Sequence, residues 1–161
     1  MNEMETTLEI NEEDTKQYIA FTLNEQLYGI EISVVQVIER LKSITRIPKA
    51  PKSVVGVFNL RGEIIPVLSL RLKFGLEEKA FDDKTRIIII RLGESSVGLI
   101  VDEVKEVLEI NEEEIEKVEV NQKGDSQSQN ILGVGKLEDN IITLLKVQNI
   151  LDEAFGLKLK K

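Results

Sequence analysis

The carboxylates are the side chains of this sequence with the widest capacity for chemistry. They occur as the pairs Asp82-Asp83 and Asp102-Glu103 and as the run Glu112-Glu113-Glu114, and such groups bind hard metal ions or transfer protons. Neighbouring residues of a strand face opposite ways, so their carboxylates do not converge on one point. The spacing of Asn111 and Glu114 instead favours a helix N-cap with its capping-box partner. These acidic groups therefore predict neither a metal site nor an acid–base pair.

The sequence contains no histidine and no cysteine. Their absence excludes Ser-His-Asp and Cys-His nucleophilic machinery, zinc sites with imidazole or thiolate ligands, and disulfides. The 21 basic and 29 acidic residues give a net charge of −8, which disfavours binding to the phosphates of nucleic acid. Most familiar catalytic constellations are therefore excluded, and we expect no cofactor and no nucleic-acid partner. A carboxylate-dependent or metal-dependent enzyme acting on a small molecule is the alternative.

The 161 residues suffice for one domain, and 42% of them are hydrophobic, which is enough for a sizeable core. We expect a flexible acidic tail over residues 1–16, a single domain over 17–156 and a basic tail over 157–161. No apolar run has the roughly 18 residues of a membrane-spanning helix. The sequence therefore predicts a cytoplasmic protein without direct membrane contact.

Most of the predicted elements are β-strands, because short runs rich in Ile and Val alternate with glycine, asparagine or charged turns. A one-turn helix is predicted with Ser33 as its N-cap. A longer helix is predicted over about 146–155, because Val147, Ile150, Leu151 and Ala154 recur at helical spacing. The predicted strands are Tyr18–Leu23, Tyr28–Ile32, Val54–Asn59, Glu63–Leu68, Arg86–Leu92 and Val97–Val101.

The two halves of the chain form an internal repeat, a pattern that indicates a duplicated structural unit. Residues 18–30 align without a gap over 87–99, and residues 55–68 align in the same way over 132–145. The repeat predicts an all-β fold of two packed five-stranded β-barrels, over about 18–68 and 87–145, related by a pseudo-two-fold axis. A shared apolar seam between them is a natural binding groove. The aligned pairs include Gly29 with Gly98, Gly56 with Gly133, Val35 with Val104 and Ile38 with Val107.

Several segments in order along the chain resemble the CheW family, the coupling proteins of bacterial chemotaxis. They are residues 17–32, 44–48, 56–67, 70–74, 98–104 and 131–135. The resemblance implies two SH3-like β-barrels and a scaffold without catalytic activity. It also implies two partners: the cytoplasmic tips of chemoreceptors, at membrane-associated arrays, and the regulatory domain of a CheA-type histidine kinase. A CheW-like adaptor for another receptor-linked kinase is an alternative within the same class.

The turn Asn59-Leu60-Arg61-Gly62 is the first candidate binding element. At the aligned turn of the second half, Glu138 replaces Arg61, so the charge is reversed. The simplest interpretation is a solvated hairpin arginine paired with Glu63, an interaction that contributes little at a surface. The resemblance implies receptor binding, for which the planar guanidinium of arginine suits a carboxylate. We therefore expect Arg61 to contact the receptor, and Asn59 and Gly62 of the same turn to take part in partner binding.

Five β-branched residues are the second candidate element. Base rates place about half of such residues in a core, and an exposed subset would form an apolar groove for a receptor helix. The resemblance favours Val35 as a contact, whereas Val37 stands where the family often has an acidic residue. Pro66 cannot donate to a ladder, so we expect it at an edge or a bulge, where the kinase could dock. The five residues are Val35, Val37, Ile38, Val104 and Val107.

Overall fold

The computed structural model describes residues 15–41, 43–117 and 129–155. Most of the expected N-terminal tail and all of 157–161 lie outside these residues. Thr15 and Lys16, which we expected in the tail, already belong to the first strand, because they pair with Asn111 and Ile110.

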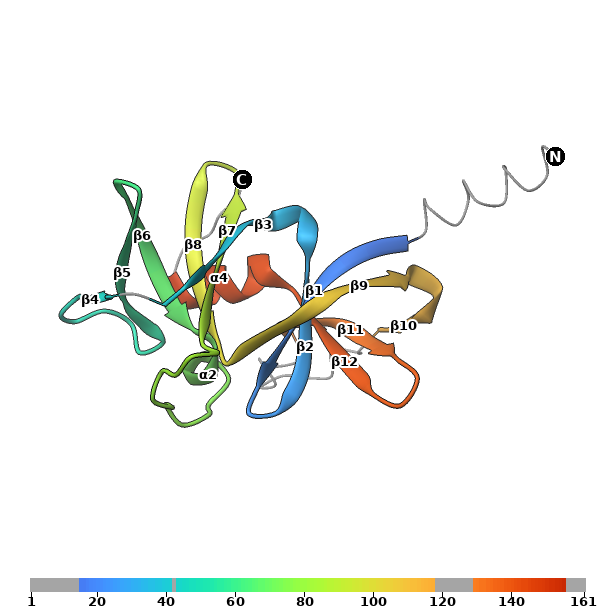
Figure 1. The fold of residues 1–161 in the computed structure, drawn as a ribbon. Coiled ribbons are helices and arrows are strands. Elements are labelled where there is room, and N and C mark those ends of the chain that lie inside the picture. Colours follow the sequence, from blue (N-terminus) through green and yellow to red (C-terminus); the bar gives the residue numbers. More distant parts are fainter. Residues whose placement is uncertain (1–14, 42, 118–128, 156–161) are drawn as a thin grey trace.

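Two six-stranded sheets make up the fold, and they confirm the predicted all-β class (Figure 1). Short strands of two residues, β10 and β4, stand at one end of each sheet. In spatial order, sheet A contains β10 (Ile115–Glu116), β11 (Ile131–Lys136), β12 (Ile141–Leu145), β2 (Gln26–Glu31), β1 (Thr15–Leu23) and β9 (Glu103–Asn111). Sheet B contains β3 (Val35–Arg40), β7 (Arg86–Leu92), β8 (Ser95–Val101), β6 (Glu63–Ser69), β5 (Val54–Leu60) and β4 (Thr45–Arg46).

The sheets do not follow the two halves of the sequence, because the halves exchange hairpins. The β1–β2 hairpin lies between β9 and β12 of the second half, and the β7–β8 hairpin lies between β3 and β6 of the first half. The two sheets have the same strand order. In sheet B, β3, β4, β5 and β6 take the places that β9, β10, β11 and β12 have in sheet A, and β7 and β8 take the places of β1 and β2. The pseudo-two-fold relation of the repeat is therefore a relation between two interlocked halves.

The strand register agrees with the aligned glycines. Gly29 pairs with Leu144 across a parallel contact, and Gly98 pairs with the equivalent Val67. Gly56 and Gly133 pair with the same two residues from the other side, each beside a register shift. The glycines of the repeat thus mark positions where neighbouring chain approaches closely, and an added Cβ at each would meet atoms within 3 Å.

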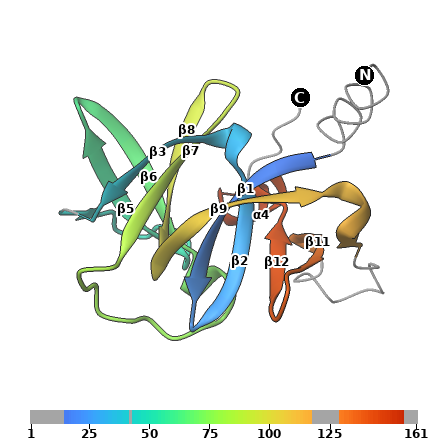
Figure 2. The same cartoon turned by 45° about the vertical axis from the view of Figure 1, so that its right-hand side comes forward.

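A central hydrophobic cluster joins the two sheets. It includes Phe21 and Leu23 of β1, Ile88 and Ile90 of β7, and the buried face of α4 (Val147–Phe155). The α4 residues predicted to face a core are the four that are buried. Smaller clusters fill each sheet separately, so the central cluster is the shared seam that the repeat predicts. Figure 2 shows α4 behind the crossing strands of the two sheets.

The short helical elements differ in part from the prediction. The 3₁₀ helix η1 covers Ile32–Val34, so Ser33 lies within it, and its N-cap Glu31 makes no side-chain capping hydrogen bond. The 3₁₀ helix η2 (Glu112–Glu114) has the predicted capping box of Asn111 and Glu114. A further helix, α2 (Leu70–Lys73), follows β6 and is capped by the Ser69 hydroxyl, which accepts a hydrogen bond from the Leu72 N–H.

Candidate functional site

The β5–β6 turn holds Arg61 in a strained backbone conformation. Arg61 has φ of 53° and Gly62 has φ of 92°, as a two-residue hairpin turn of type I′ requires. The Asn59 side-chain oxygen accepts a hydrogen bond of 2.9 Å from the Gly62 N–H and braces the turn. Arginine is a poor residue for positive φ, where asparagine and glycine are favoured. Glu25 and Lys49 also adopt positive φ, so the turn accommodates Arg61 at a modest conformational cost.

The Arg61 side chain is exposed. The ion pair with Glu63 that we considered from the sequence is not formed among the described residues. The guanidinium is therefore available to a partner without first breaking an ion pair. At the equivalent turn of sheet A, the Leu137 N–H donates to the Asn140 carbonyl at 2.8 Å. The hairpin is therefore present in both sheets, with the acidic Glu138 in the place of Arg61.

Four of the five predicted apolar residues lie on the outer strands of the two sheets and face the central cluster. Val35 and Ile38 of β3 pair with Ile90 and Ile88, and Val104 and Val107 of β9 pair with Phe21 and Ile19. All four pairing partners belong to the central cluster. We call this set of residues the valine rim: Val35, Ile38, Val104 and Val107.

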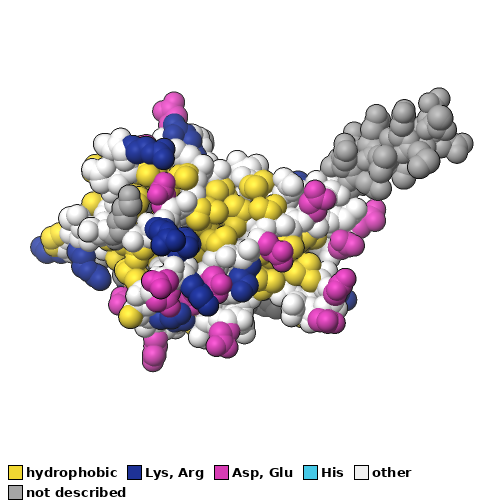
Figure 3. All heavy atoms as spheres, viewed as in Figure 1, with side chains coloured by type: hydrophobic (Ala, Val, Ile, Leu, Met, Phe, Trp, Pro, Cys, Tyr) yellow, Lys and Arg dark blue, Asp and Glu magenta, His cyan; other side chains and the backbone are white. Residues whose placement is uncertain are grey.

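The valine rim is partly open to solvent. Val35, Ile38 and Val104 are half-buried against the central cluster, whereas Val107 is 49% exposed. Hydrophobic side chains gather in the middle of this face, between β3 and β9 (Figure 3). An exposed apolar surface rimmed by charged residues is typical of a protein-binding site.

Val37 does not join the valine rim. It pairs with Ile89 and packs against the cluster of sheet B that contains Phe58 and Leu60. Successive residues of a strand face opposite ways, and the register shift between Val35 and Val37 turns Val35 to the side of Ile38. Val37 therefore points into the sheet B cluster while Val35 and Ile38 face the seam. Arg61 stands apart from the rim as well, at the tip of the β5–β6 hairpin, directly after Leu60.

Pro66 lies in β6, an interior strand of sheet B, so the prediction of an edge strand is wrong for β6 as a whole. On the β8 side, however, pairing begins only at Val67. The stretch Glu63–Pro66 pairs with β5 alone and leaves one side of the strand open, which tolerates the missing N–H of proline. Ile64, in this stretch, is 59% exposed.

An ion pair that the sequence analysis missed lies where β8 of sheet B leads into β9 of sheet A. Asp102 accepts hydrogen bonds from Arg71 Nε at 2.9 Å and Nη2 at 3.0 Å, and from the Asn24 N–H at 2.8 Å. Burial alone would raise the pKa of Asp102, but these hydrogen bonds and the charge of Arg71 hold it below its usual value. The hydrogen bond with Asp102 raises the pKa of Arg71.

No motif at local spacing could have revealed this ion pair, because its partners are 31 residues apart. The only signal available was the repeat itself. Continued three residues past each aligned stretch, it places the charged Asp102 and Arg71 opposite the uncharged Ser33 and Gln148.

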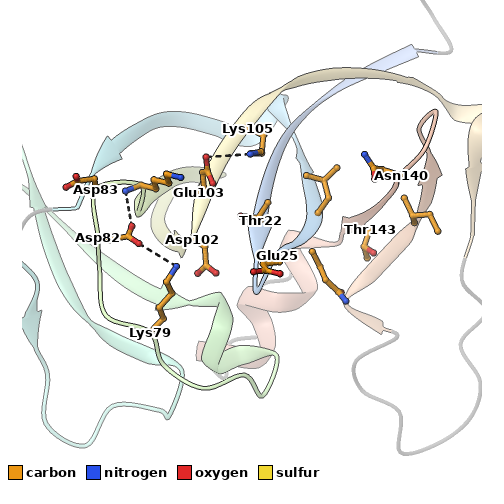
Figure 4. A pocket seen from close by; sticks show the side chains of 14 residues that line it. Thr22, Glu25, Lys79, Asp82, Asp83, Asp102, Glu103, Lys105, Asn140 and Thr143 are labelled. Atoms are coloured by element: carbon orange, nitrogen blue, oxygen red, sulfur yellow. Dashed lines mark hydrogen bonds and ion pairs between the residues drawn. The ribbon is translucent and has the colours of Figure 1, made fainter.

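A surface pocket of about 1010 Å³ around the β1–β2 turn is lined by several of the carboxylates (Figure 4). They do not form a bare acidic cluster. Lys79 pairs with Asp82 at 3.5 Å, Lys105 pairs with Glu103 at 3.6 Å, and Asp102 is held by Arg71. Within the described ranges, no three acidic side chains are grouped as metal ligands would be. The geometry gives no specific support to the enzyme alternative.

No helix in the part of the chain that the structure describes is long and apolar enough to cross a membrane.

Together, the interlocked barrels, the open valine rim and the exposed arginine turn define a protein-interaction module. The family model of the CheW-like domain matches residues 17–155, so the chain belongs to the CheW-like family. The chain is 36% identical to the chemotaxis protein CheW of Helicobacter pylori over 89% of this chain and 86% of that protein. It is 34% identical to CheW of Bacillus subtilis over 86% of this chain and 88% of that protein.

The fold is also similar to a solved structure. The crystal structure of the scaffolding protein TtCheW from Thermoanaerobacter tengcongensis superposes with a TM-score of 0.76 at 35% identity, covering 91% of each chain. This similarity confirms the predicted fold.

Proposed function

We propose that this protein is a non-enzymatic chemotaxis scaffold that couples the cytoplasmic tips of chemoreceptors to a CheA-type histidine kinase. The observation that carries the proposal is the valine rim, an apolar surface shared by both sheets in a chain of the CheW-like family. In this role the protein works in the cytoplasm and reaches receptor arrays through its partners.

We assign the receptor to the valine rim and to Arg61. An amphipathic receptor helix presents apolar anchors at i, i+3 and i+4, which suit a groove of β-branched side chains. The exposed Arg61 guanidinium suits a carboxylate elsewhere on the receptor tip, because arginine binds carboxylates through two parallel hydrogen bonds. Asn59 and Gly62 contribute by holding the turn. Val37 points into the sheet B barrel and supports it from within.

We assign the kinase to the open stretch of β6. Residues Glu63–Pro66 present an unpaired side toward solvent, and Ile64 adds an exposed apolar side chain. A regulatory domain with an exposed strand of its own would dock edge to edge at this stretch. Ile65 is fully buried, so a charged residue there would disturb the core, whereas Ile64→Lys tests the surface.

The experiment is isothermal titration of the protein with a receptor-tip fragment and, separately, with the regulatory domain of a CheA kinase from the same organism. Arg61→Glu is expected to weaken receptor binding about tenfold or more and to leave kinase binding unchanged. Ile64→Lys is expected to do the reverse. Lys136→Glu, the same charge change at the exposed end of β11, is the control and should leave receptor binding unchanged.

Arg61→Asn separates binding from folding. Asparagine adopts positive φ more readily than arginine, so the free energy of unfolding should stay the same or rise while receptor binding falls as in Arg61→Glu. Receptor binding that survives Arg61→Asn would remove Arg61 from the site. A wild-type protein that binds neither partner would refute the coupling function and favour an adaptor for another receptor-linked kinase.

A further inference from the structure

The two places where the chain passes between the sheets next to the valine rim are built differently. At one, Asp102 separates Val101, the end of β8, from Glu103, the start of β9. At the other, η1 separates β2 from β3 and carries Ser33 at the position equivalent to Asp102. Each crossover is followed two residues later by a member of the rim, Val104 or Val35. The crossovers therefore fix where the two sides of the rim begin. We call Val104 and Val107 the β9 wall of the rim, and Val35 and Ile38 its β3 wall.

The Asp102 crossover is tied to three other segments. Its carboxylate binds Arg71 of α2 through two hydrogen bonds and the N–H of Asn24 in the β1–β2 turn. Its own N–H donates to the Thr22 carbonyl at 3.1 Å. Arg71 also donates from Nη1 to the Glu77 carbonyl at 2.7 Å, in the segment that joins the two halves. One ion pair thus connects sheet A, the helix that follows sheet B and the linking segment.

The ion pair is also sheltered from solvent. The Arg71 and Asp102 side chains are 15% and 13% exposed. A bidentate pair with little exposure holds its geometry more firmly than a surface pair, because neither side chain is free to exchange its partner for water.

The opposite crossover lacks this link. Ser33 is exposed, and Gln148, the equivalent of Arg71, donates instead to Asp152 within its own helix at 3.1 Å. The two walls of the rim also differ in how far their side chains are exposed. Val107, on the β9 wall, is 49% exposed, whereas its equivalent Ile38 is half-buried. The pseudo-two-fold relation is therefore broken at the crossovers and at the rim.

We propose that the Arg71–Asp102 pair is a positioning link that holds the β9 wall of the valine rim in its receptor-binding placement. The β3 wall, which follows the unlinked crossover at Ser33, is the wall that adjusts to the bound helix. Arg71 and Asp102 act through the placement of Val104 and need not touch the receptor. The proposal rests on the proposed function, because receptor binding at the rim is its main readout.

The test compares Asp102→Asn and Arg71→Lys with the control Lys73→Met. Asparagine keeps an acceptor for the Asn24 N–H but removes the charge, and lysine keeps the charge but loses the paired hydrogen bonds. Lys73→Met breaks a different sheltered ion pair, Lys73–Glu153 at 2.6 Å, which joins α2 to α4. Each protein is titrated with the receptor-tip fragment and the kinase regulatory domain, below its unfolding transition.

Asp102→Asn is expected to weaken receptor binding about fivefold or more, and Arg71→Lys is expected to weaken it less. Kinase binding should stay unchanged in both variants, and Lys73→Met should bind both partners as wild type does. Hydrogen exchange should speed up at residues 103–107 in Asp102→Asn and not in Lys73→Met. Wild-type receptor affinity in a folded Asp102→Asn protein, or equal weakening in Lys73→Met, would overturn the proposal.

Hydrogen exchange separates this proposal from the proposed function. If the wild-type protein binds no receptor fragment, the proposed function fails, yet exchange at residues 103–107 still reports whether the ion pair holds β9. Unchanged exchange in Asp102→Asn would refute the link whatever the partners are.

Discussion

At the scale of single residues, two arginines in this protein have contrasting environments. Arg71 is sheltered and donates three hydrogen bonds, two to Asp102 and one to the Glu77 carbonyl, so it organises the protein itself. Arg61 is exposed on a turn that favours asparagine and glycine, and in the proposed function its guanidinium binds a partner. The exposure of the side chain and the number of hydrogen bonds that it already makes within the protein distinguish an arginine that stabilises a fold from one that recognises a ligand.

Asp102 should make a measurable contribution to the dependence of stability on pH. Its pKa is lower in the folded than in the unfolded protein, so its stabilising effect is complete above the unfolded value of about 3.9 and is lost as the pH falls through the folded value. At neutral pH we expect Asp102→Asn to lower the free energy of unfolding by about 2 kcal/mol.

Urea denaturation of wild type and Asp102→Asn from pH 7 down to pH 3 checks this expectation. The difference between the two proteins should shrink below about pH 4. A difference that stays constant over this range would show that the carboxylate charge does not carry the stabilisation.

At the scale of elements, close approach of strands explains the aligned glycines better than turn formation does. A Cβ on Gly56 would collide with the Thr45 carbonyl oxygen and lie 2.9 Å from Arg46 Cα. Both are backbone atoms of β4, which pairs with β5 at this point. Gly56 therefore keeps the short strand β4 attached to sheet B.

Gly56→Ala should displace β4 and lower the free energy of unfolding by about 3 kcal/mol. Gly133→Ala, at the equivalent position, should cost less, because its nearest contact is the Ile115 side chain at 2.6 Å and the nearest backbone atom, the Glu116 oxygen, is farther away at 2.9 Å. Thermal or chemical denaturation of both variants measures the difference. An equal loss in the two would mean that the β4 backbone yields as easily as a side chain.

Local patterns predicted those elements whose own residues determine them. The apolar spacing of α4 and the Asn111–Glu114 capping box both agree with the structure. The longest second-half strand, β9, was not among the predicted strands, because exposed glutamates and Lys105 interrupt its apolar residues. The inward direction of Val37 was also not predicted, since it depends on a register shift between Val35 and Val37 that only pairing with β7 reveals.

At the scale of the whole molecule, neither half of the chain completes a sheet alone. The β1–β2 hairpin pairs with β9 and β12, and the β7–β8 hairpin pairs with β3 and β6. The repeat predicted two similar units and an apolar seam between them. The exchange of hairpins could not be predicted, because either pairing scheme buries the same alternating apolar residues.

Separated halves should therefore depend on each other to fold. Fragments 1–76 and 77–161, each prepared alone, should lack the cooperative unfolding transition of the intact protein, and an equimolar mixture should recover it. Circular dichroism with thermal denaturation, together with sedimentation to establish the mass of each species, measures this. A monomeric fragment that unfolds cooperatively alone would contradict the prediction.

The hairpin exchange also bears on ancestry. Two copies of a half-length chain, each donating its hairpin to the other, would assemble the same pair of sheets as a symmetric homodimer. In such a dimer every substitution appears twice, so an arginine turn or an ion pair at one crossover only is impossible. Joining the copies into one polypeptide frees the halves to diverge, and the Arg61 turn and the Arg71–Asp102 pair are differences that a homodimer of identical halves could not carry.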